Sequence, residues 1–301
     1  MSFQYKIPTE LAEHVKIGTC SWKYDSWKGL VYKPDQRYHA HDYLPDYAKH
    51  FTTVEIDQWF WSLFGSGAKL PNPADVKRYT DSVPDNFRFT VKAPNSITLT
   101  HFYAKGSKQR ANEPNPHFLS VDLLNRFLET LETMHGKLGP IMFQFEYLNK
   151  QKMPSPAAFL ERLHAFFQQA PTGFQYAVET RNPNYLKDEF FDFLRQHKLG
   201  YVLLDGYYMP RIAEVAGKFD ICTAPSSIIR LHGPDRAGIE ERTGGVWNEI
   251  VAAKDDGLQT TAEIIRQNQK RDVNTYVNVN NHYEGSAPLT IQRLLNILRS
   301  R

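Results

Sequence analysis

The chain has 301 residues, 41% of them hydrophobic and 13% aromatic, which excludes a disordered protein and is ample for a sizeable core. Its 36 Lys and Arg against 33 Asp and Glu give a net charge of +3, well short of a dedicated nucleic-acid coat protein. Met1–Glu10 lack the apolar core of a signal peptide, and no segment has the length and apolarity of a membrane span. The two cysteines, Cys20 and Cys222, are far apart in the sequence, which argues against a disulfide framework. We therefore expect a cytoplasmic protein without a membrane partner.

Short apolar segments alternate with helix-like segments from residue 15 onward. In Phe87-Arg88-Phe89-Thr90-Val91, for example, apolar side chains occupy alternate positions, which is the period of a β-strand. This pattern predicts eight strands, at residues 15–21, 52–58, 87–93, 139–145, 175–180, 200–205, 227–232 and 274–280. Helices are predicted at residues 41–50, 73–82, 119–135, 156–169, 186–197, 258–270 and 287–298. An aromatic loop at 22–38, a polar insertion at 95–117, a poorly patterned stretch after the sixth strand and an insertion after the seventh complete the chain.

Eight strands, each followed by a helix or a long loop, are typical of a single TIM-type (β/α)8 barrel. We expect one domain over residues 1–301, with a core from about 15 to 300 and long loop insertions at the C-terminal face. No linker rich in Pro, Gly or Ser divides the chain. A doubly wound open sheet is disfavoured, because the polar strand ends recur throughout the chain and do not gather at one switch point.

The downstream ends of the predicted strands carry polar side chains on one parity. Successive strand residues point to opposite faces, and parallel strands end at the same edge, so these groups should converge at the barrel mouth. The predicted mouth set is Glu55, Asp57, Lys92, Gln144, Glu179, Arg181, Asp205, Arg230, His232, Asn278 and Asn280, with Asn281 and His282 on the last loop.

Four members of this set are candidate catalytic residues. Glu55 and Glu179 are general acid or base candidates, since apolar neighbours raise the pKa of a carboxyl group. Lys92 carries a compact positive charge, and nearby cations would lower the pKa of its amine. A Schiff base at Lys92 is therefore conceivable. His232 is a candidate proton shuttle, although a histidine satisfied within a hydrogen-bond network is an equal alternative.

Most of the remaining members, together with Trp22, are candidate ligand-binding residues: Asp57, Gln144, Arg181, Asp205, Arg230, Asn280, Asn281 and His282. The planar guanidinium groups of Arg181 and Arg230 can donate paired hydrogen bonds to a carboxylate or phosphate. Trp22, in the aromatic loop, is a candidate for stacking on a sugar ring or base. The insertion at 95–117 carries Lys105, Lys108 and Arg110 and could form a basic lid over an anionic ligand. A solvated surface loop is the commoner explanation for such a charge run.

Two other interpretations of the mouth set stay open. The charges could simply neutralise one another in a polar plug inside the barrel. Alternatively, a divalent metal could take ligands from Glu55, Glu179, Asp205, His232 and His282. No HExxH spacing supports a metal, and three cations compete at the same strand ends, so metal is not favoured and no residue is assigned to one.

Several short motifs along the chain resemble those of the YecE-like family, catalogued as domain of unknown function 72. Ile17-Gly18-Thr19-Cys20-Ser21-Trp22 is similar to the family's opening signature. The likeness continues in order through Val54-Glu55-Ile56, Phe89 to Lys92, Thr100-His101, Leu138-Gly139-Pro140, Gln144-Phe145, Glu179 with Arg181, Arg230 with His232-Gly233, and Asn280-Asn281-His282. The resemblance implies a TIM-type barrel, adds His101 to the binding candidates and names no reaction, because the family has no established activity.

Together these features predict an enzyme, a hydrolase, lyase or isomerase, that uses acid/base chemistry on a small polar or phosphorylated ligand at the barrel mouth. One alternative is a metal-assisted phosphodiesterase or nuclease-like barrel, for which DNA would be the partner. Another is a barrel that binds a metabolite without catalysis. The residues themselves specify neither a substrate nor a cofactor nor an oligomeric state.

Overall fold

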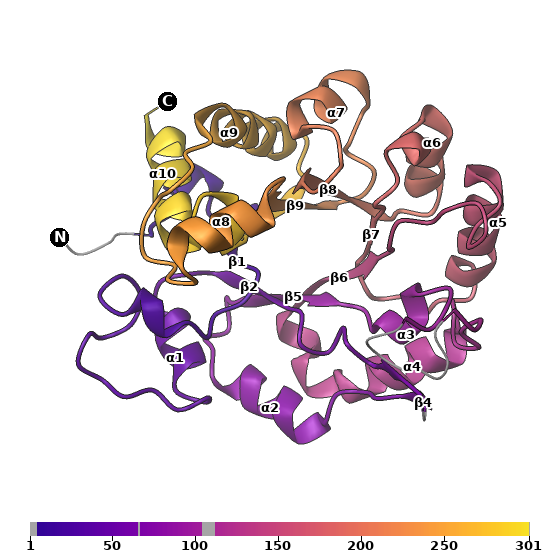
Figure 1. The fold of residues 1–301 in the computed structure, drawn as a ribbon, viewed down its shortest axis with the longest axis horizontal. Helices are drawn as coiled ribbons and strands as arrows, with labels where there is room; N and C mark the ends of the chain where they lie inside the picture. The colour runs from indigo at the N-terminus through magenta and orange to yellow at the C-terminus, as the bar shows by residue number, and fades with distance from the viewer. Residues whose placement is uncertain (1–4, 66, 104–111, 301) are drawn as a thin grey trace.

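A computed structural model describes residues 5–65, 67–103 and 112–300. Its centre is a closed barrel of eight parallel strands in the order β1-β10-β9-β8-β7-β6-β5-β2 (Figure 1). The barrel strands are β1 (Val15–Thr19), β2 (Thr53–Ile56), β5 (Arg88–Lys92), β6 (Leu138–Gln144), β7 (Tyr176–Glu179), β8 (Gly200–Gly206), β9 (Ser226–Gly233) and β10 (Asn274–Val279). The predicted TIM-type architecture is confirmed, and all eight strands lie where the alternating pattern predicts them.

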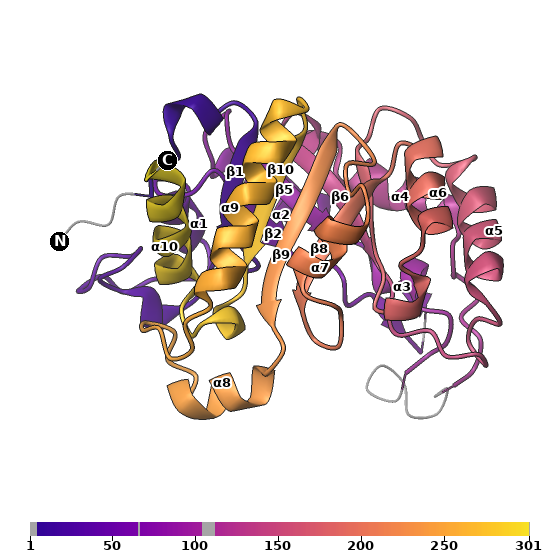
Figure 2. The ribbon, with the colours of Figure 1, turned by 90° about the horizontal axis from the view of Figure 1, so that it is seen from above.

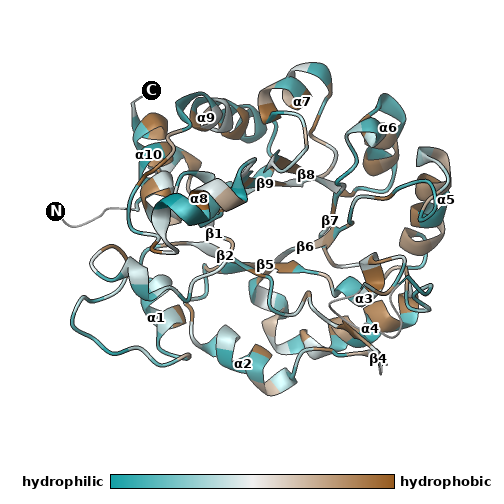
Figure 3. Ribbon diagram, viewed as in Figure 1, coloured by the Kyte–Doolittle hydropathy of each residue, from teal (hydrophilic) through white to brown (hydrophobic). Residues whose placement is uncertain are grey.

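Helices surround the barrel, and their apolar sides face it (Figures 1 and 3). The helices are α1 (Tyr43–Tyr47), α2 (Pro73–Asp81), α3 (Asn95–Thr98), α4 (Val121–Thr130), α5 (Pro156–Phe167), α6 (Asp188–Gln196), α7 (Ile212–Lys218), α8 (Arg236–Thr243), α9 (Asp255–Lys270) and α10 (Ala287–Arg299). Local chemistry sets several helix starts: the side chains of Asn72, Ser120 and Ser155 each accept a hydrogen bond from a backbone N–H in the first turn. A short hairpin pairs β3 (Leu63–Phe64) with β4 (Gly67–Ala68).

Three helices were not predicted from the sequence. α7 and α8 lie in the stretches after the sixth and seventh strands, and α3 begins the insertion at 95–117. All three are short, so they carry too little periodic pattern to identify. Figure 2 shows α8 beyond the barrel at the end toward which β9 points, which places it over the C-terminal face.

The insertion at 95–117 is less solvated than its composition indicates. Asn95, Ser96 and Thr98 are fully buried, and Asn95 accepts hydrogen bonds from the backbone N–H groups of Ser62 and Leu63. The basic residues of the proposed lid, Lys105, Lys108 and Arg110, lie outside the described residues. The first part of this insertion is therefore packed structure.

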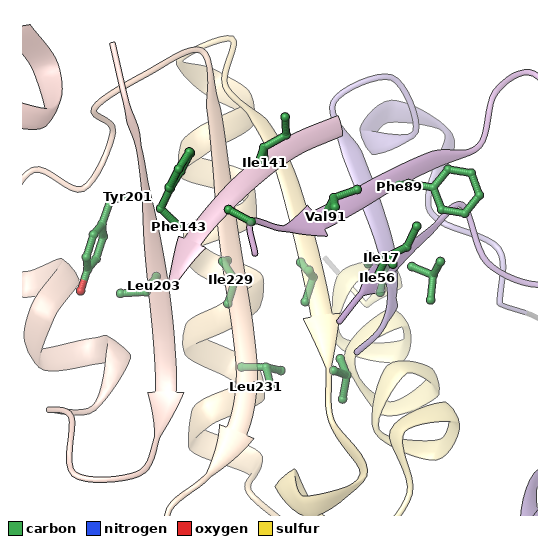
Figure 4. Packing of buried hydrophobic residues seen from close by; sticks show 14 of the residues in the cluster. Ile17, Ile56, Phe89, Val91, Ile141, Phe143, Tyr201, Leu203, Ile229 and Leu231 are labelled. Atoms are coloured by element: carbon green, nitrogen blue, oxygen red, sulfur yellow. The ribbon is translucent and has the colours of Figure 1, made fainter. Parts of the chain in front are cut away.

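Apolar side chains form two layers around the strands. Outward-facing residues such as Ile17, Phe89 and Leu203 fill the space between the barrel and its helices (Figure 4). A second cluster, Met142, Ala177, Val202, Ile228 and Tyr276, comes from the opposite strand faces and fills the interior. On this same inward parity, the residues nearer the strand C-termini are polar, so the core gives way to charge toward the mouth.

Gly18 lets β1 approach β2 closely. A Cβ atom at this position would lie 1.8 Å from the carbonyl oxygen of Thr53. The Tyr47 hydroxyl, from α1, donates to that same oxygen at 3.0 Å and accepts from the Thr19 backbone N–H at 2.9 Å. These contacts hold β1, β2 and α1 together below the mouth.

Candidate functional site

Arg230, on β9, lies between two carboxylates inside the mouth of the barrel. Its Nε and Nη2 donate to the Glu55 carboxylate at 2.8 and 2.7 Å, and its Nη1 donates to Glu179 Oε2 at 2.5 Å. All three side chains are at most 2% exposed. Burial opposes the charge on Arg230, but Glu179 and Glu55 outweigh it and raise the pKa of the guanidinium. The three residues form a buried, mutually paired group.

Glu179 is held in its ionised form. Its second oxygen accepts from Arg181 Nε at 2.7 Å. Burial alone would raise the pKa of Glu179, yet Arg230 and Arg181 together lower it to about 2. The expectation that apolar neighbours would raise this pKa is wrong, because the sequence does not reveal that two arginines converge on one carboxylate. Glu179 is therefore a permanent anion at neutral pH.

Asn278, on β10, supports this group from below. Its Nδ2 donates to Thr90 Oγ1 at 2.9 Å and to Glu55 Oε2 at 3.4 Å. Both Asn278 and Thr90 are fully buried. The Asn278 amide thus helps to fix the position of the Glu55 carboxylate along the barrel axis.

Lys92, the last residue of β5, differs from the arginines because it is not paired. Within the described residues, its ammonium makes no hydrogen bond or ion pair, and it lies 3.9 Å from the centre of the Phe60 ring. The side chain is 8% exposed. Burial, aided by Arg230, lowers the pKa of Lys92 to about 8, although Glu55 and Glu179 act in the opposite direction.

His232, on β9, and Cys20, which directly follows β1, meet at the mouth. The Cys20 Sγ lies 3.4 Å from His232 Nε2, and the Tyr207 hydroxyl lies 3.3 Å from His232 Nδ1. Burial and then Arg230 lower the pKa of His232, while burial raises the pKa of the Cys20 thiol. Both groups are neutral in consequence, so this pair lacks the thiolate and imidazolium of an activated cysteine.

A cavity of about 920 Å³ opens above β6, β7 and β8, and we call it the mouth pocket. Its lining includes Gln144, Glu146, Tyr147, Arg181, Tyr207 and Tyr208. The Arg181 guanidinium lies 4.0 Å from the centre of the Tyr207 ring. Gln144 links the pocket to the buried group, because its Oε1 accepts from Arg230 Nη1 at 3.4 Å.

The two other predicted carboxylates, Asp57 and Asp205, lie in different places. Asp57 is half-buried above Glu55, and burial followed by repulsion from Glu55 raises its pKa. The prediction that Asp205 joins the mouth set is wrong, because Asp205 has the same parity on β8 as the outward-facing Leu203. It lines a second cavity of about 420 Å³ that also contains Arg211 and Lys254. Burial raises the pKa of Asp205, although the Tyr283 hydroxyl donates to its Oδ2 at 2.8 Å.

Three other predicted residues have structural partners of their own. Trp22 is only 3% exposed and packs edge-on against Tyr79, at 5.4 Å between ring centres. His101 contacts the Thr100 hydroxyl through Nδ1 at 2.9 Å. Asn281 accepts from the backbone N–H of Ala287 at 2.9 Å and so anchors the start of α10. No described contact joins these side chains to the buried group around Arg230.

The last loop is likewise bound to its neighbours. The Asn280 side chain accepts from the His282 backbone N–H at 3.0 Å and contacts the His282 ring at 2.5 Å. His282 Nε2 lies 2.8 Å from Glu240 on α8. Burial lowers the pKa of His282, while Glu240 opposes this change. This chain of contacts ties α8 to the barrel.

In the described ranges, no three His, Cys, Asp or Glu side chains come together in a way that could hold a metal ion. The same ranges contain no helix with the length and apolarity needed to cross a membrane.

Comparison with known proteins gives this architecture a family. The sequence pattern described as "Protein of unknown function DUF72" matches residues 16–301. The chain belongs to this family. It is 25% identical over 175 residues to the UPF0759 protein YecE of Escherichia coli K12, and the match covers 57% of this chain and 50% of that protein. The chain thus spans about half the length of the curated relatives it matches.

Solved DUF72 structures share the fold. A crystal structure of a DUF72 protein from Thermotoga maritima has 23% identity and a TM-score of 0.64, covering 95% of this chain and 99% of that one. A DUF72 protein from Enterococcus faecalis has 19% identity and a TM-score of 0.62, covering 95% of both chains. The chain is therefore a DUF72 protein with a TIM-type barrel, in a family whose function is not known.

Some residues of the mouth were not identified from the sequence. Tyr207 and Tyr208 follow β8 on a loop, and the Phe60 ring lies against the Lys92 ammonium. Gly206-Tyr207-Tyr208 directly after a buried strand is the one signal that could have indicated Tyr207. Which side of the loop its ring takes depends on the tertiary structure.

Proposed function

We propose that this DUF72 protein is an enzyme that binds a small anionic ligand in the mouth pocket and transfers a proton through Lys92. The observation that carries the proposal is the buried Lys92 ammonium, which has no paired carboxylate among the described residues. Burying a charge without a partner is costly, and an internal plug would not require it. Such a group is better explained by a partner that arrives with a ligand.

The pKa of Lys92 suits it to proton transfer. At about 8, as burial and Arg230 set it, roughly a tenth of the amine is neutral at pH 7, so the group can both accept and return a proton. Glu179, with a pKa near 2, is a poor proton donor at neutral pH. We therefore assign Glu179 and its partner Arg230 to the electrostatic framework, and Lys92 to the reacting position.

Arg181 provides the anion contact. Its Nε is used by Glu179, whereas its two terminal nitrogens donate no hydrogen bond to a described residue. The guanidinium lines the mouth pocket and lies over Tyr207, which keeps its plane oriented. A planar pair of free N–H groups fits a carboxylate or a phosphate.

A thermal-shift screen tests ligand binding. The panel contains inorganic phosphate, carboxylic acids, sugar phosphates, nucleotides, Mg²⁺ and short DNA, because any compound that binds the folded state raises its Tm. Carboxylates or phosphates should stabilise the wild type and lose this effect in Arg181→Gln. Arg271→Gln is the matched control, since Arg271 pairs with Asp220 on the surface.

The outcomes separate the open alternatives. Stabilisation by Mg²⁺ or DNA alone would favour the metal-assisted nuclease and contradict the proposal. An anion that binds but whose C–H protons exchange with solvent equally fast in the presence of wild type and Lys92→Met would indicate a binding protein without catalysis. If nothing stabilises the wild type, the mouth charges only neutralise one another.

A further inference from the structure

Lys92 has the surroundings of a nucleophilic amine as well as those of a base. An amine attacks carbonyl carbon only when it is uncharged, and apolar surroundings or a neighbouring cation favour that form. The Lys92 side chain is 8% exposed, so burial and the nearby Arg230 cation favour the uncharged amine, while the Phe60 ring 3.9 Å from Nζ marks where the nitrogen lies. No described hydrogen bond occupies the nitrogen lone pair or directs it away from the mouth.

We propose that Lys92 forms a Schiff base with the carbonyl carbon of a small ligand that also carries a carboxylate or a phosphate. This inference rests on the proposed function, because Arg181 and the mouth pocket supply the anion contact. It names the substrate class of the same site: a small keto or aldehyde acid, or a phosphorylated ketone or aldehyde.

The surroundings of Lys92 stabilise the product of this reaction. A protonated imine is a cation at neutral pH, and both the Phe60 ring and the carboxylates of Glu55 and Glu179 favour positive charge at this position. In the free protein about a tenth of the Lys92 amine lacks this charge at pH 7, because its pKa is about 8. The imine would retain it, and it would draw electrons from the bond next to the carbonyl carbon, as lysine Schiff bases do.

Asp57 is placed to move the protons that imine formation requires. It is half-buried and acts electrostatically on Lys92, and burial followed by Glu55 raises its pKa. Asp57 first takes a proton from the Lys92 ammonium. The neutral amine then attacks the carbonyl carbon, and the carbonyl oxygen takes that proton from Asp57. Asp57 next removes a proton from the nitrogen and returns it to the hydroxyl, which leaves as water while the nitrogen lone pair forms the C=N bond. Ammonium and carbonyl compound thus become protonated imine and water, and Asp57 ends as the carboxylate it was at the start.

Borohydride trapping tests the inference directly. The intact protein is incubated with pyruvate, glyoxylate or dihydroxyacetone phosphate and then reduced, and the adduct is located by peptide mass spectrometry. Reduction adds the mass of the carbonyl compound less one oxygen atom. We expect the adduct on Lys92 with at least one probe, and about tenfold or more labelling above acetone, which lacks the anion.

Matched variants show whether the label is specific. Lys92→Met and Lys92→Arg should lose the adduct, whereas Lys218→Met, which removes a lysine from α7, should keep it. Circular dichroism and the Tm of each variant separate lost chemistry from lost folding. Absence of a Lys92 adduct with all three probes, or equal labelling of Lys92→Met and wild type, would overturn the inference.

The two proposals fail in different ways. Anion-dependent stabilisation without trapping would refute the imine and leave the proposed anion site intact. Trapping of Lys92 by acetone as strongly as by pyruvate, with no anion-dependent stabilisation, would contradict the proposed anion site and the substrate class.

Discussion

Arg230→Met is the most informative single change in this protein. The side chain is 2% exposed and supplies the only cation that contacts both Glu55 and Glu179 among the described residues. Methionine keeps much of the length but removes the charge and all five donor N–H groups. Glu179 would still have Arg181 at 2.7 Å, whereas the one contact left to Glu55 among the described side chains would be the long one to Asn278 at 3.4 Å.

The expected loss follows from that asymmetry. Removing one partner of a buried ion pair typically costs about 3–5 kcal/mol, because the remaining charge stays out of water without compensation. We expect a value within this range for Arg230→Met, chiefly from Glu55. Converting Glu55 to Gln in the same chain should recover part of the loss, because the orphaned charge disappears.

Urea unfolding followed by circular dichroism measures the difference. The control is Arg271→Met, whose ion pair with Asp220 has both side chains about half exposed, and a loss of at most about 1 kcal/mol is expected there. If Arg230→Met is no more destabilising than this control, the buried group does not contribute to stability as argued. If Glu55→Gln fails to compensate, the orphaned charge is not the cause.

Three further predictions concern acid stability, Lys92 and strand packing. Glu179 has a pKa of about 2, since its two arginines outweigh the opposing effect of burial, against an ordinary value of 4.5. The ionised carboxylate should therefore contribute on the order of 3 kcal/mol to the free energy of unfolding above about pH 4.5, and this contribution should disappear toward pH 2. In urea titrations, the difference in unfolding free energy between wild type and Glu179→Gln should be smaller at pH 3 than at pH 7. Burial gives Lys92 a pKa of about 8, so its ammonium opposes folding, and Lys92→Met should be more stable than wild type at pH 7, by at most about 3 kcal/mol. That advantage should shrink as the pH rises from 8 toward 10.5; an unchanged difference would refute the pKa assignment. Gly18→Ala should lower the free energy of unfolding by about 3 kcal/mol or more, because its Cβ would meet the Thr53 carbonyl. The control is Gly217→Ala, whose Cβ would meet nothing within 4 Å and which should be neutral or stabilising in thermal unfolding. Similar melting temperatures for the two variants would contradict the close approach of β1 and β2.

The sequence allowed the barrel to be predicted because strand patterning is local. In β9, the alternation through Ile229, Arg230 and Leu231 places the apolar residues against the helices and the arginine inside. α8 was missed for the opposite reason, since only Ile239 and Thr243 of its eight residues are buried. A helix with so narrow an apolar face resembles a polar loop in sequence.

The direction of the Glu179 pKa could not be predicted from its neighbours along the chain. Val178 is apolar, and on that basis the carboxyl group should have a raised pKa. The arginine that lowers it is 51 positions away, on the strand two places round the barrel. Local sequence reports burial, whereas the sign of a pKa shift depends on which charges meet the group in space.

The sequence by itself therefore determined the eight strands, the barrel they form and the polar ends that line its mouth. These features follow from a two-residue period and from the shared direction of parallel strands. Only the tertiary structure decided which charges pair, because barrel closure brings Arg230 against Glu55 from 175 positions away. The same closure leaves the Lys92 amine over an aromatic ring and without a carboxylate partner in the described chain, and the proposed chemistry rests on that unpaired nitrogen.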